Sequence, residues 1–558
     1  MKKTLLSVTA ALALAVAGCG DEDEPDAASG PASVMPADTP IYVEATVRPE
    51  GEQAENLDAL LAELGELPLI GSVGNPGDLL VNQLESQAAA AGVDFSYAED
   101  VEPWLGEKAA FGVYDPNGAE DSFVAALETT DEEAAREAID SLLSEDTVEY
   151  EEGEYEGVSY TSAPGDSFRV GIFAEHVVLA PADEFENAVD ASEGDSLASS
   201  DALEESLAQL DEDSLASVFI DLEQLTAFAS TPEDEEEIEQ AKEALPELFD
   251  GGFAVSAGVS AADQVYLDYS TPLFEGQPEA GASDLLGTAP GDALGAFALA
   301  DLGSFGPPIV DIFERLNDAG ADLEDFPEDG IAAAFEDETG ISFDDATAAI
   351  GDGSLWVRGD LPDGVEVAGE IEVTDTEVAA DLIDAIEQEV ESEGGAKLGP
   401  PVGGSDVGFS AIETSDFDAA ACSSVGDAAE CLPSGGAQAD LPFTNIELDG
   451  EVLRYGFFKD AAAARASDPD SGGDFSDTEA YAAGEEALGD DFEYVGAVDL
   501  APILDEFVRG PSIPEAVIGG SPEEAIGGFL ADKLGVVAFG VRYDDETAIQ
   551  RYVLKLAE

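Results

Sequence analysis

Residues 122–143, SFVAALETTDEEAAREAIDSLL, and residues 366–387, EVAGEIEVTDTEVAADLIDAIE, decide the fold, because each joins an apolar strand pattern to an amphipathic helix pattern. In both stretches a Thr-Asp pair precedes the helix pattern, ending at Asp131 in the first and at Asp375 in the second. Either the threonine or the aspartate of each pair, Thr130 or Asp131 and Thr374 or Asp375, can accept hydrogen bonds from the first backbone amides of a helix. The spacing of the apolar residues predicts a helix over 131–144 and a matching helix in the second stretch.

The two stretches belong to a weak internal duplication of the chain. Four segments recur in the same order; the pairs are anchored at Pro36 and Pro290, Gly92 and Gly340, Asp221 and Asp499, and Phe253 and Val536. One such match arises easily in a chain rich in Ala, Glu and Asp, whereas four in the same order indicate two copies. The segment TPLFEGQPEAGASD has the Pro, Gly and Ser of a linker, so we expect one lobe over 35–278 and a second over 285–558.

Each copy alternates short strand patterns with turns and helices. Strand patterns occur at 109–115, 122–129 and 170–180, and further helices are expected at 53–66, 77–91, 200–210 and 233–248. The strands are rarely separated by single clean helices, as parallel crossovers would require. The pattern predicts an α+β fold of two duplicated lobes, each a mainly antiparallel sheet with helices packed on one face.

The N-terminus has the pattern of an export signal. Lys2 and Lys3 precede an apolar run that is too short to span a membrane and ends at Cys19. The ending Val-Ala-Gly-Cys resembles the lipobox of bacterial lipoproteins. That resemblance implies cleavage of a signal peptide at 1–18 and acylation of Cys19, for example with palmitate. We expect a lipid anchor at the extracytoplasmic face of the cell membrane, followed by an acidic tether over 19–34; the alternative is an ordinary secretory signal.

The charge of the chain is extreme. Without Lys2 and Lys3 the mature chain has 16 Lys+Arg against 127 Asp+Glu, and 16 − 127 gives a net charge of −111. Such self-repulsion opposes a compact state unless salt screens it, which favours a saline habitat. The hydrophobic content of 44% is enough for a sizeable core. Nucleic acids and anionic lipid surfaces are excluded as partners, because both would repel the chain.

The remaining cysteines and the histidine indicate structure rather than catalysis. Cys422 and Cys431 lie in a Gly/Ser/Ala-rich loop and, outside the cytoplasm, predict one local disulfide. The single histidine, His176, is expected to be an exposed strand residue, matched in the second copy near residues 454–456. Because the chain has neither an HExxH zinc motif nor a GxSxG elbow, we expect no enzyme and no cofactor.

Two patterns are candidates for binding. In DPDSGGDFSDTE the side chains of Asp468, Asp470, Asp474 and Glu479 fall near ligand positions of an EF-hand calcium loop, although Gly472 stands where an oxygen ligand is usual. The first copy has no such loop, and a solvated acidic loop is the alternative. Trp104 and Trp356 lie at nearly equivalent places of the two copies and are either core residues or the lining of a ligand groove.

The strand PADTPIYVEATV after a lipoprotein signal, together with the duplicated hairpin-helix units, resembles a family of actinobacterial-type envelope lipoproteins known only as a domain of unknown function. This resemblance implies an extracytoplasmic role without catalysis and supplies no site residues. Three functions stay open. The first is a lipid-anchored binding or scaffold protein for a small molecule or an envelope protein; the others are a calcium-dependent adhesion module and a carboxylate-based hydrolase.

Overall fold

The computed structural model divides the chain into two compact units. Unit 1 comprises Met1–Leu273 with Asp544–Ile549, and unit 2 comprises Phe274–Tyr543 with Gln550–Glu558. The structure describes residues 30–64, 81, 85–86, 89, 95–114, 122–145, 150–163, 165, 167–208, 210–211, 214–226, 232–249, 251–274, 276–279, 281–321, 326–327, 329–359, 366–393, 396–413, 443–458, 473–489, 491–503, 533–544 and 547–557. The expected lobes, 35–278 and 285–558, stay a prediction beside this division.

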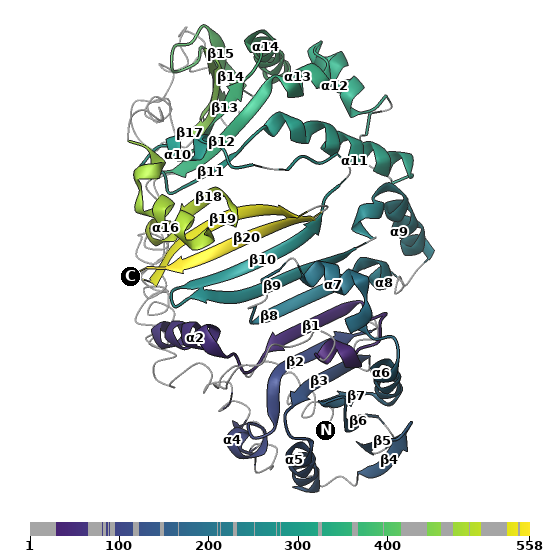
Figure 1. Cartoon of the computed structure of the whole chain (residues 1–558). Coiled ribbons are helices and arrows are strands. Elements are labelled where there is room, and N and C mark those ends of the chain that lie inside the picture. The colour runs from purple at the N-terminus through teal and green to yellow at the C-terminus, as the bar shows by residue number, and fades with distance from the viewer. Residues whose placement is uncertain are drawn as a thin grey trace, which may run out of the picture. The chain divides into compact units, whose positions relative to one another are not determined.

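The first ten strands build an antiparallel sheet in unit 1 (Figure 1). They are β1 (Ile41–Thr46), β2 (Leu105–Val113), β3 (Phe123–Thr129), β4 (Glu151–Tyr155), β5 (Val158–Ser162), β6 (Arg169–Phe173), β7 (His176–Ala180), β8 (Ala216–Asp221), β9 (Gly252–Ala261) and β10 (Gln264–Pro272). The strands pair in the order β4-β5-β6-β7-β3-β2-β1-β8-β9-β10. The expected antiparallel pairing is therefore confirmed for this sheet.

The sheet of unit 2 repeats this pairing pattern. Its strands are β11 (Gly295–Leu299), β12 (Ile350–Arg358), β13 (Glu366–Val373), β14 (Ala396–Gly399), β15 (Val407–Glu413), β16 (Phe443–Asp449), β17 (Val452–Phe458), β18 (Glu493–Asp499), β19 (Leu534–Asp544) and β20 (Thr547–Leu556). They pair in the order β14-β15-β16-β17-β13-β12-β11-β18-β19-β20. Each neighbour relation in unit 1 thus has a counterpart in unit 2.

The helices lie between the strands at recurring places. Unit 1 has α2 (Gly51–Leu64), α4 (Tyr97–Asp100), α5 (Glu132–Glu145), α6 (Ala182–Glu193), α7 (Asp201–Leu207), α8 (Leu222–Thr226) and α9 (Pro232–Ala244), with 3-10 helices η2 (Pro31–Val34), η3 (Leu197–Ser199) and η4 (Pro246–Leu248). Unit 2 has α10 (Leu285–Thr288), α11 (Gly306–Asp318), α12 (Ile331–Thr339), α13 (Phe343–Ala348), α14 (Thr376–Glu393) and α16 (Glu479–Leu488), with η5 (Leu302–Phe305) and η8 (Phe475–Asp477).

Helices cover both faces of the sheet in unit 1, so the expectation of a single covered face was wrong. Val177 and Val178 are neighbours on β7 and therefore point to opposite faces. Val178 packs in one apolar cluster with Phe185 of α6, and Val177 packs in another with Ala135 of α5. The cause is in the sequence: runs such as FVAAL in β3 are apolar at consecutive positions and do not alternate with polar residues.

Unit 2 is covered in the same way. Val373 and Ala368 of β13 are an odd number of residues apart and face opposite sides of the sheet. Val373 packs with Ile383 of α14, whereas Ala368 packs with Ala480 of α16. Two apolar layers therefore enclose each sheet.

The folded body begins earlier than the sequence suggested. The tether was expected to extend to residue 34, but η2 starts at Pro31, and Val34 is fully buried in the cluster that contains Phe185. The last part of the expected tether therefore belongs to the core of unit 1.

The predicted helix starts are confirmed in both units. The carboxylate of Asp131 accepts hydrogen bonds from the backbone amides of Glu133 and Ala134 at 3.1 and 3.0 Å. Asp375 accepts from the amides of Glu377 and Val378 at 3.0 and 3.2 Å. The same cap therefore precedes α5 and α14.

Removing either cap is expected to destabilise the protein modestly. Asp131→Ala and Asp375→Ala should each lower the free energy of unfolding by about 1 kcal/mol, because two amides lose their acceptor. Urea unfolding in high salt measures the change, with Asp140→Ala on the solvent side of α5 as the control. Asp131→Asn, which keeps an acceptor, should retain most of the stability, and equal losses for Asp131→Ala and Asp140→Ala would contradict the capping role.

Candidate functional site

The residues predicted for lipidation and disulfide formation, Cys19, Cys422 and Cys431, lie outside the described part of the chain. Both predictions therefore stand unchanged. Among the described residues no helix is long and apolar enough to cross a membrane.

The acidic loop of the calcium prediction is described only at its second half. Asp468 and Asp470 lie outside the described residues, while Asp474 precedes η8 and Glu479 is the first residue of α16. Phe475 between them is fully buried. In the described ranges no group of three or more ligating side chains gathers to hold a metal ion. Calcium binding by this loop remains a prediction.

The described half of this loop resembles a segment of unit 1 in its capped helix and in the 3-10 helix before it. Thr478 caps α16 by accepting from the amide of Tyr481, and Ser200 caps α7 by accepting from the amide of Leu203. A 3-10 helix precedes each cap, with Phe475 or Leu197 as its first residue. The match was missed because the two segments share burial and capping but few residue types.

Trp104 and Trp356 are both buried core residues, but they occupy different places in the two units. Trp104 is 4% exposed, and its indole nitrogen donates to the carbonyl oxygen of Asp100 at 2.6 Å. Trp356 is 2% exposed and stands on β12 opposite Ala296. The matching strand pair in unit 1 places Gly112 at the position of Trp356, so the two tryptophans are not equivalent. The structure gives each indole a place in the apolar core of its own unit.

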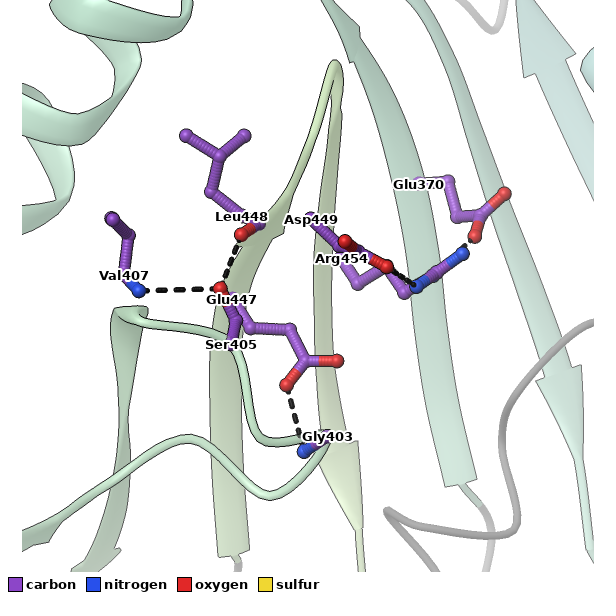
Figure 2. Close-up of polar contacts among 8 residues, drawn as sticks. All are labelled: Glu370, Gly403, Ser405, Val407, Glu447, Leu448, Asp449 and Arg454. Atoms are coloured by element: carbon purple, nitrogen blue, oxygen red, sulfur yellow. Dashed lines mark hydrogen bonds and ion pairs between the residues drawn. The ribbon is translucent and has the colours of Figure 1, made fainter.

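A row of ionised side chains crosses three strands of unit 2 (Figure 2). The Arg454 Nε of β17 donates to Glu370 Oε1 of β13 at 2.7 Å, and its Nη1 lies 3.3 Å from Asp449 Oδ2. Arg454 also stands directly opposite Glu447 of β16. The Arg454 side chain is 30% exposed and that of Glu370 is 10% exposed, so the row is only partly open to solvent. We call Glu370, Glu447 and Arg454 the ionic row.

The loop between β14 and β15 is fastened to the ionic row. Glu447 Oε2 accepts from the amide of Gly403 at 2.8 Å, and the Ser405 hydroxyl donates to the carbonyl oxygen of Leu448 (Figure 2). A Cβ at Gly403 would lie 2.1 Å from Glu447 Oε1. A side chain at residue 403 would therefore have to push the Glu447 carboxylate aside.

Unit 1 has an apolar core at the place of the ionic row. The pair Ala126 and Val178 in unit 1 matches Glu370 and Arg454 in unit 2, and Gly171 matches Glu447. Ala126 and Val178 are fully buried in the cluster that contains Phe185. Since the sheet of unit 1 has the same strand order without charges at this place, the strand pairing does not depend on an ionic row, and buried ion pairs contribute little net stability. It is the best candidate in unit 2 for a binding surface.

A second row of polar side chains crosses β1, β2, β3 and β7 of unit 1, beside the apolar cluster that contains Phe185. We call Glu44, Lys108, Glu128 and His176 the polar row. Lys108 Nζ of β2 lies 2.8 Å from Glu44 Oε1 of β1, and the Tyr42 hydroxyl donates to Glu44 Oε2 at 2.6 Å. Glu128 of β3 stands directly opposite His176 of β7. Burial works against the charged form of Lys108, but the charge and hydrogen bond of Glu44 raise the Lys108 pKa on balance.

His176 is fully buried, so the expectation of an exposed residue was wrong. The turn at Ala174 and Glu175 places His176 opposite Phe173 at the start of β7, on the face covered by α6. The same hairpin position in unit 2 is Val452, not the region of residues 454–456 that the sequence suggested. Burial lowers the pKa of His176, and the charge of Glu128 opposes this shift.

With this geometry in view, comparison with known proteins gives one positive result. Residues 80–281 match the family model DUF3352, a protein of unknown function. The match covers β2 to β10, and therefore most of unit 1 and only the first residues of unit 2. Neither a curated protein nor a solved structure matches the chain.

The DUF3352 domain includes Lys108, Glu128 and His176 of the polar row, but not Glu44. The expected resemblance to a domain of unknown function is thus confirmed over a smaller part of the chain than anticipated. The ionic row lies outside the DUF3352 domain, in unit 2.

Loss of the cation alone should disturb the ionic row more than loss of the ion pair. Arg454→Val leaves Glu370 and Glu447 uncompensated and should lower the free energy of unfolding by roughly 2 kcal/mol, less than for a fully buried pair. The double variant Glu370→Ala/Arg454→Val reproduces the pair found in unit 1 and should lose about 1 kcal/mol less than Arg454→Val.

Chemical denaturation at constant high salt measures both changes. Asp449→Ala, whose side chain is 72% exposed, removes the solvent-side partner of Arg454 and serves as the control, with a change below about 0.5 kcal/mol. Equal losses in the single and double variants would show that the carboxylates need no cation.

Proposed function

We propose that this protein is a lipid-anchored binding or scaffold protein of the extracytoplasmic face of the cell membrane. The observation that carries the proposal is the ending Val-Ala-Gly-Cys of a short apolar run behind Lys2 and Lys3, with Cys19 as the acylated residue. Two or more acyl chains on one cysteine give stable attachment, whereas a single chain gives marginal attachment. The acidic stretch that follows Cys19 separates the anchor from the folded units.

We also propose that the two units are copies of one ancestral unit. Three independent features support this: the shared order of strand pairing, the aspartate caps at Asp131 and Asp375, and the capped helices α7 and α16 behind a 3-10 helix. A chance resemblance between two sheets would not reproduce the caps at matching places. On this reading the ionic row is a difference acquired after duplication.

The ionic row is our proposed binding surface in unit 2. It combines one guanidinium and two carboxylates at a place that is apolar in unit 1, and the loop that contains Gly403 lies against it. Such a surface suits a polar ligand or a peptide segment with both donors and acceptors, because each of its groups can be matched by a directed hydrogen bond. The partner class is a small polar molecule or a segment of an envelope protein.

The anchor is tested by changing its cysteine. Cys19→Ser should move the protein from the membrane fraction to the soluble fraction, and the N-terminal peptide of the wild type should start at Cys19 and carry the mass of acyl groups. Cys422→Ser is the matched control and should stay membrane-bound. A wild-type N-terminal peptide without acyl mass would refute the lipid anchor.

Binding is tested by native mass spectrometry of the mature body, purified in high salt from its own host and transferred to a volatile salt. A co-purifying organic molecule or protein on the wild type, lost from Glu370→Ala/Arg454→Val, is the expected result. A bare wild-type protein that takes up only calcium would favour the adhesion alternative. Retention of the bound species by the double variant would remove the ionic row as its site.

A further inference from the structure

The hairpin between β6 and β7 has an unusual turn. Ala174 and Glu175 have φ values of 47° and 60°, in the left-handed region that glycine and asparagine occupy most easily. The corresponding turn of unit 2 begins with Gly450, at a φ of 65°, and is followed by Val452. In unit 1 the ring of His176 bonds the turn instead, through Nδ1 and the carbonyl oxygen of Ala174.

This contact fixes the tautomer of the neutral imidazole. A carbonyl oxygen only accepts, so Nδ1 carries the hydrogen and Nε2 is left as a bare acceptor. Nε2 of His176 is buried and has no hydrogen-bond partner among the described residues. Protonation would turn this atom into a charged donor inside the sheet, and a buried charge requires a partner.

The carboxylate of Glu128 is the acceptor placed to bind this new donor. It stands directly opposite His176 on the neighbouring strand, where side chains of paired residues come into contact. Glu128 Oε2 already accepts from the amides of Glu107 and Lys108, both at 2.9 Å. These amides lie where β2 shifts its register against β3, between Leu105 and Ala109, so the carboxylate replaces the missing partner of a β-bulge.

We propose that His176 and Glu128 form a pH-sensitive latch in unit 1: neutral His176 leaves Glu128 on the amides of the β2 bulge, and protonated His176 draws it away from them. The latch is independent of the lipid anchor and of the ionic row. Opening it loosens β2 beside Lys108, whose ammonium group is tied to Glu44 on β1.

The charged groups around His176 are compatible with both the neutral and the protonated imidazole. Glu128, Glu175 and Glu44 favour the imidazolium, but burial outweighs them and lowers the pKa of His176. On the α6 side the carboxylates have other partners: Glu184 bonds Ser122 and Asn187, Glu186 pairs with Arg169, and Asp190 bonds Tyr155, while Asp183 is exposed. Lys108 and Glu107 on β2 complete the set of nearby charges.

The sign of the pH effect follows from this lowered pKa. The unfolded chain takes up the proton near the ordinary value of 6.5, before the folded chain does, so the unfolded state binds more protons in this interval. The contribution of neutral His176 to stability is complete above 6.5 and is lost as the pH falls toward and through the folded-state pKa. The latch therefore opens on acidification.

The chain has one histidine, so its imidazole signals can be titrated by NMR without assignment of other histidines. We expect a folded-state pKa below 6.5. Hydrogen exchange of the Glu107 and Lys108 amides, corrected for intrinsic rates, should accelerate by up to about tenfold per unit fall in pH above the folded-state pKa of His176, and should level off below it. The amide of Ala126 on β3 should keep its protection, which separates latch opening from global unfolding.

His176→Asn keeps a donor for the Ala174 carbonyl but does not titrate, and its amides at 107 and 108 should show no pH-dependent acceleration. In Glu128→Gln the side-chain oxygen can still accept from the amides of the bulge, but the side chain has no negative charge to attract the imidazolium. The amides at 107 and 108 of this variant should therefore also show no pH-dependent acceleration. Acceleration of equal size in His176→Asn and the wild type would overturn the latch. If neither variant folds, a wild-type imidazole that titrates at or above 6.5 would overturn it.

Discussion

Two-sided burial of each antiparallel sheet is the constraint on which the rest of the structure depends. A chain with 127 Asp+Glu and 18 Lys+Arg repels itself at every point of its surface, so the interior must hold it together. Consecutive apolar residues such as Val177 and Val178 place side chains on both faces of one strand, and helices cover both. The second apolar layer adds buried area that a sheet with one solvated face would lack.

The sequence predicted what depends on local chemistry. The aspartates before α5 and α14 cap them as expected, because a cap involves only residues two or three apart. The antiparallel pairing followed from the short connections. The number of covered faces did not follow, since a run of small apolar residues is compatible with either arrangement until its neighbours are known.

The candidate sites were out of reach of sequence reasoning for a different reason. Glu370 and Arg454 are 84 residues apart and meet only through the pairing of β13 with β17. His176 was expected to be exposed because a lone histidine in a strand more often is, yet the turn before it directs its ring into the core. In a chain with so many carboxylates, the register of the strands is what singles out Glu128, Glu370 and Glu447 from the rest.

The placement of the cations extends this argument. Among the described residues, five Lys and Arg side chains lie in ion pairs within or against the sheets and are no more than 30% exposed: Lys108, Arg169, Arg358, Arg454 and Lys555. In ~1 M salt the Debye length is about 3 Å, so an exposed cation would do little there to relieve the repulsion between surface carboxylates. A half-buried pair is screened much less and keeps its directional bonds. Both units use these cations in two ways. Lys108 of unit 1 and Arg358 and Arg454 of unit 2 tie strand to strand. Arg169 of unit 1 and Lys555 of unit 2 tie a strand to a helix, α6 and α16, so each sheet is joined by sheltered ion pairs both internally and to the layer that covers it.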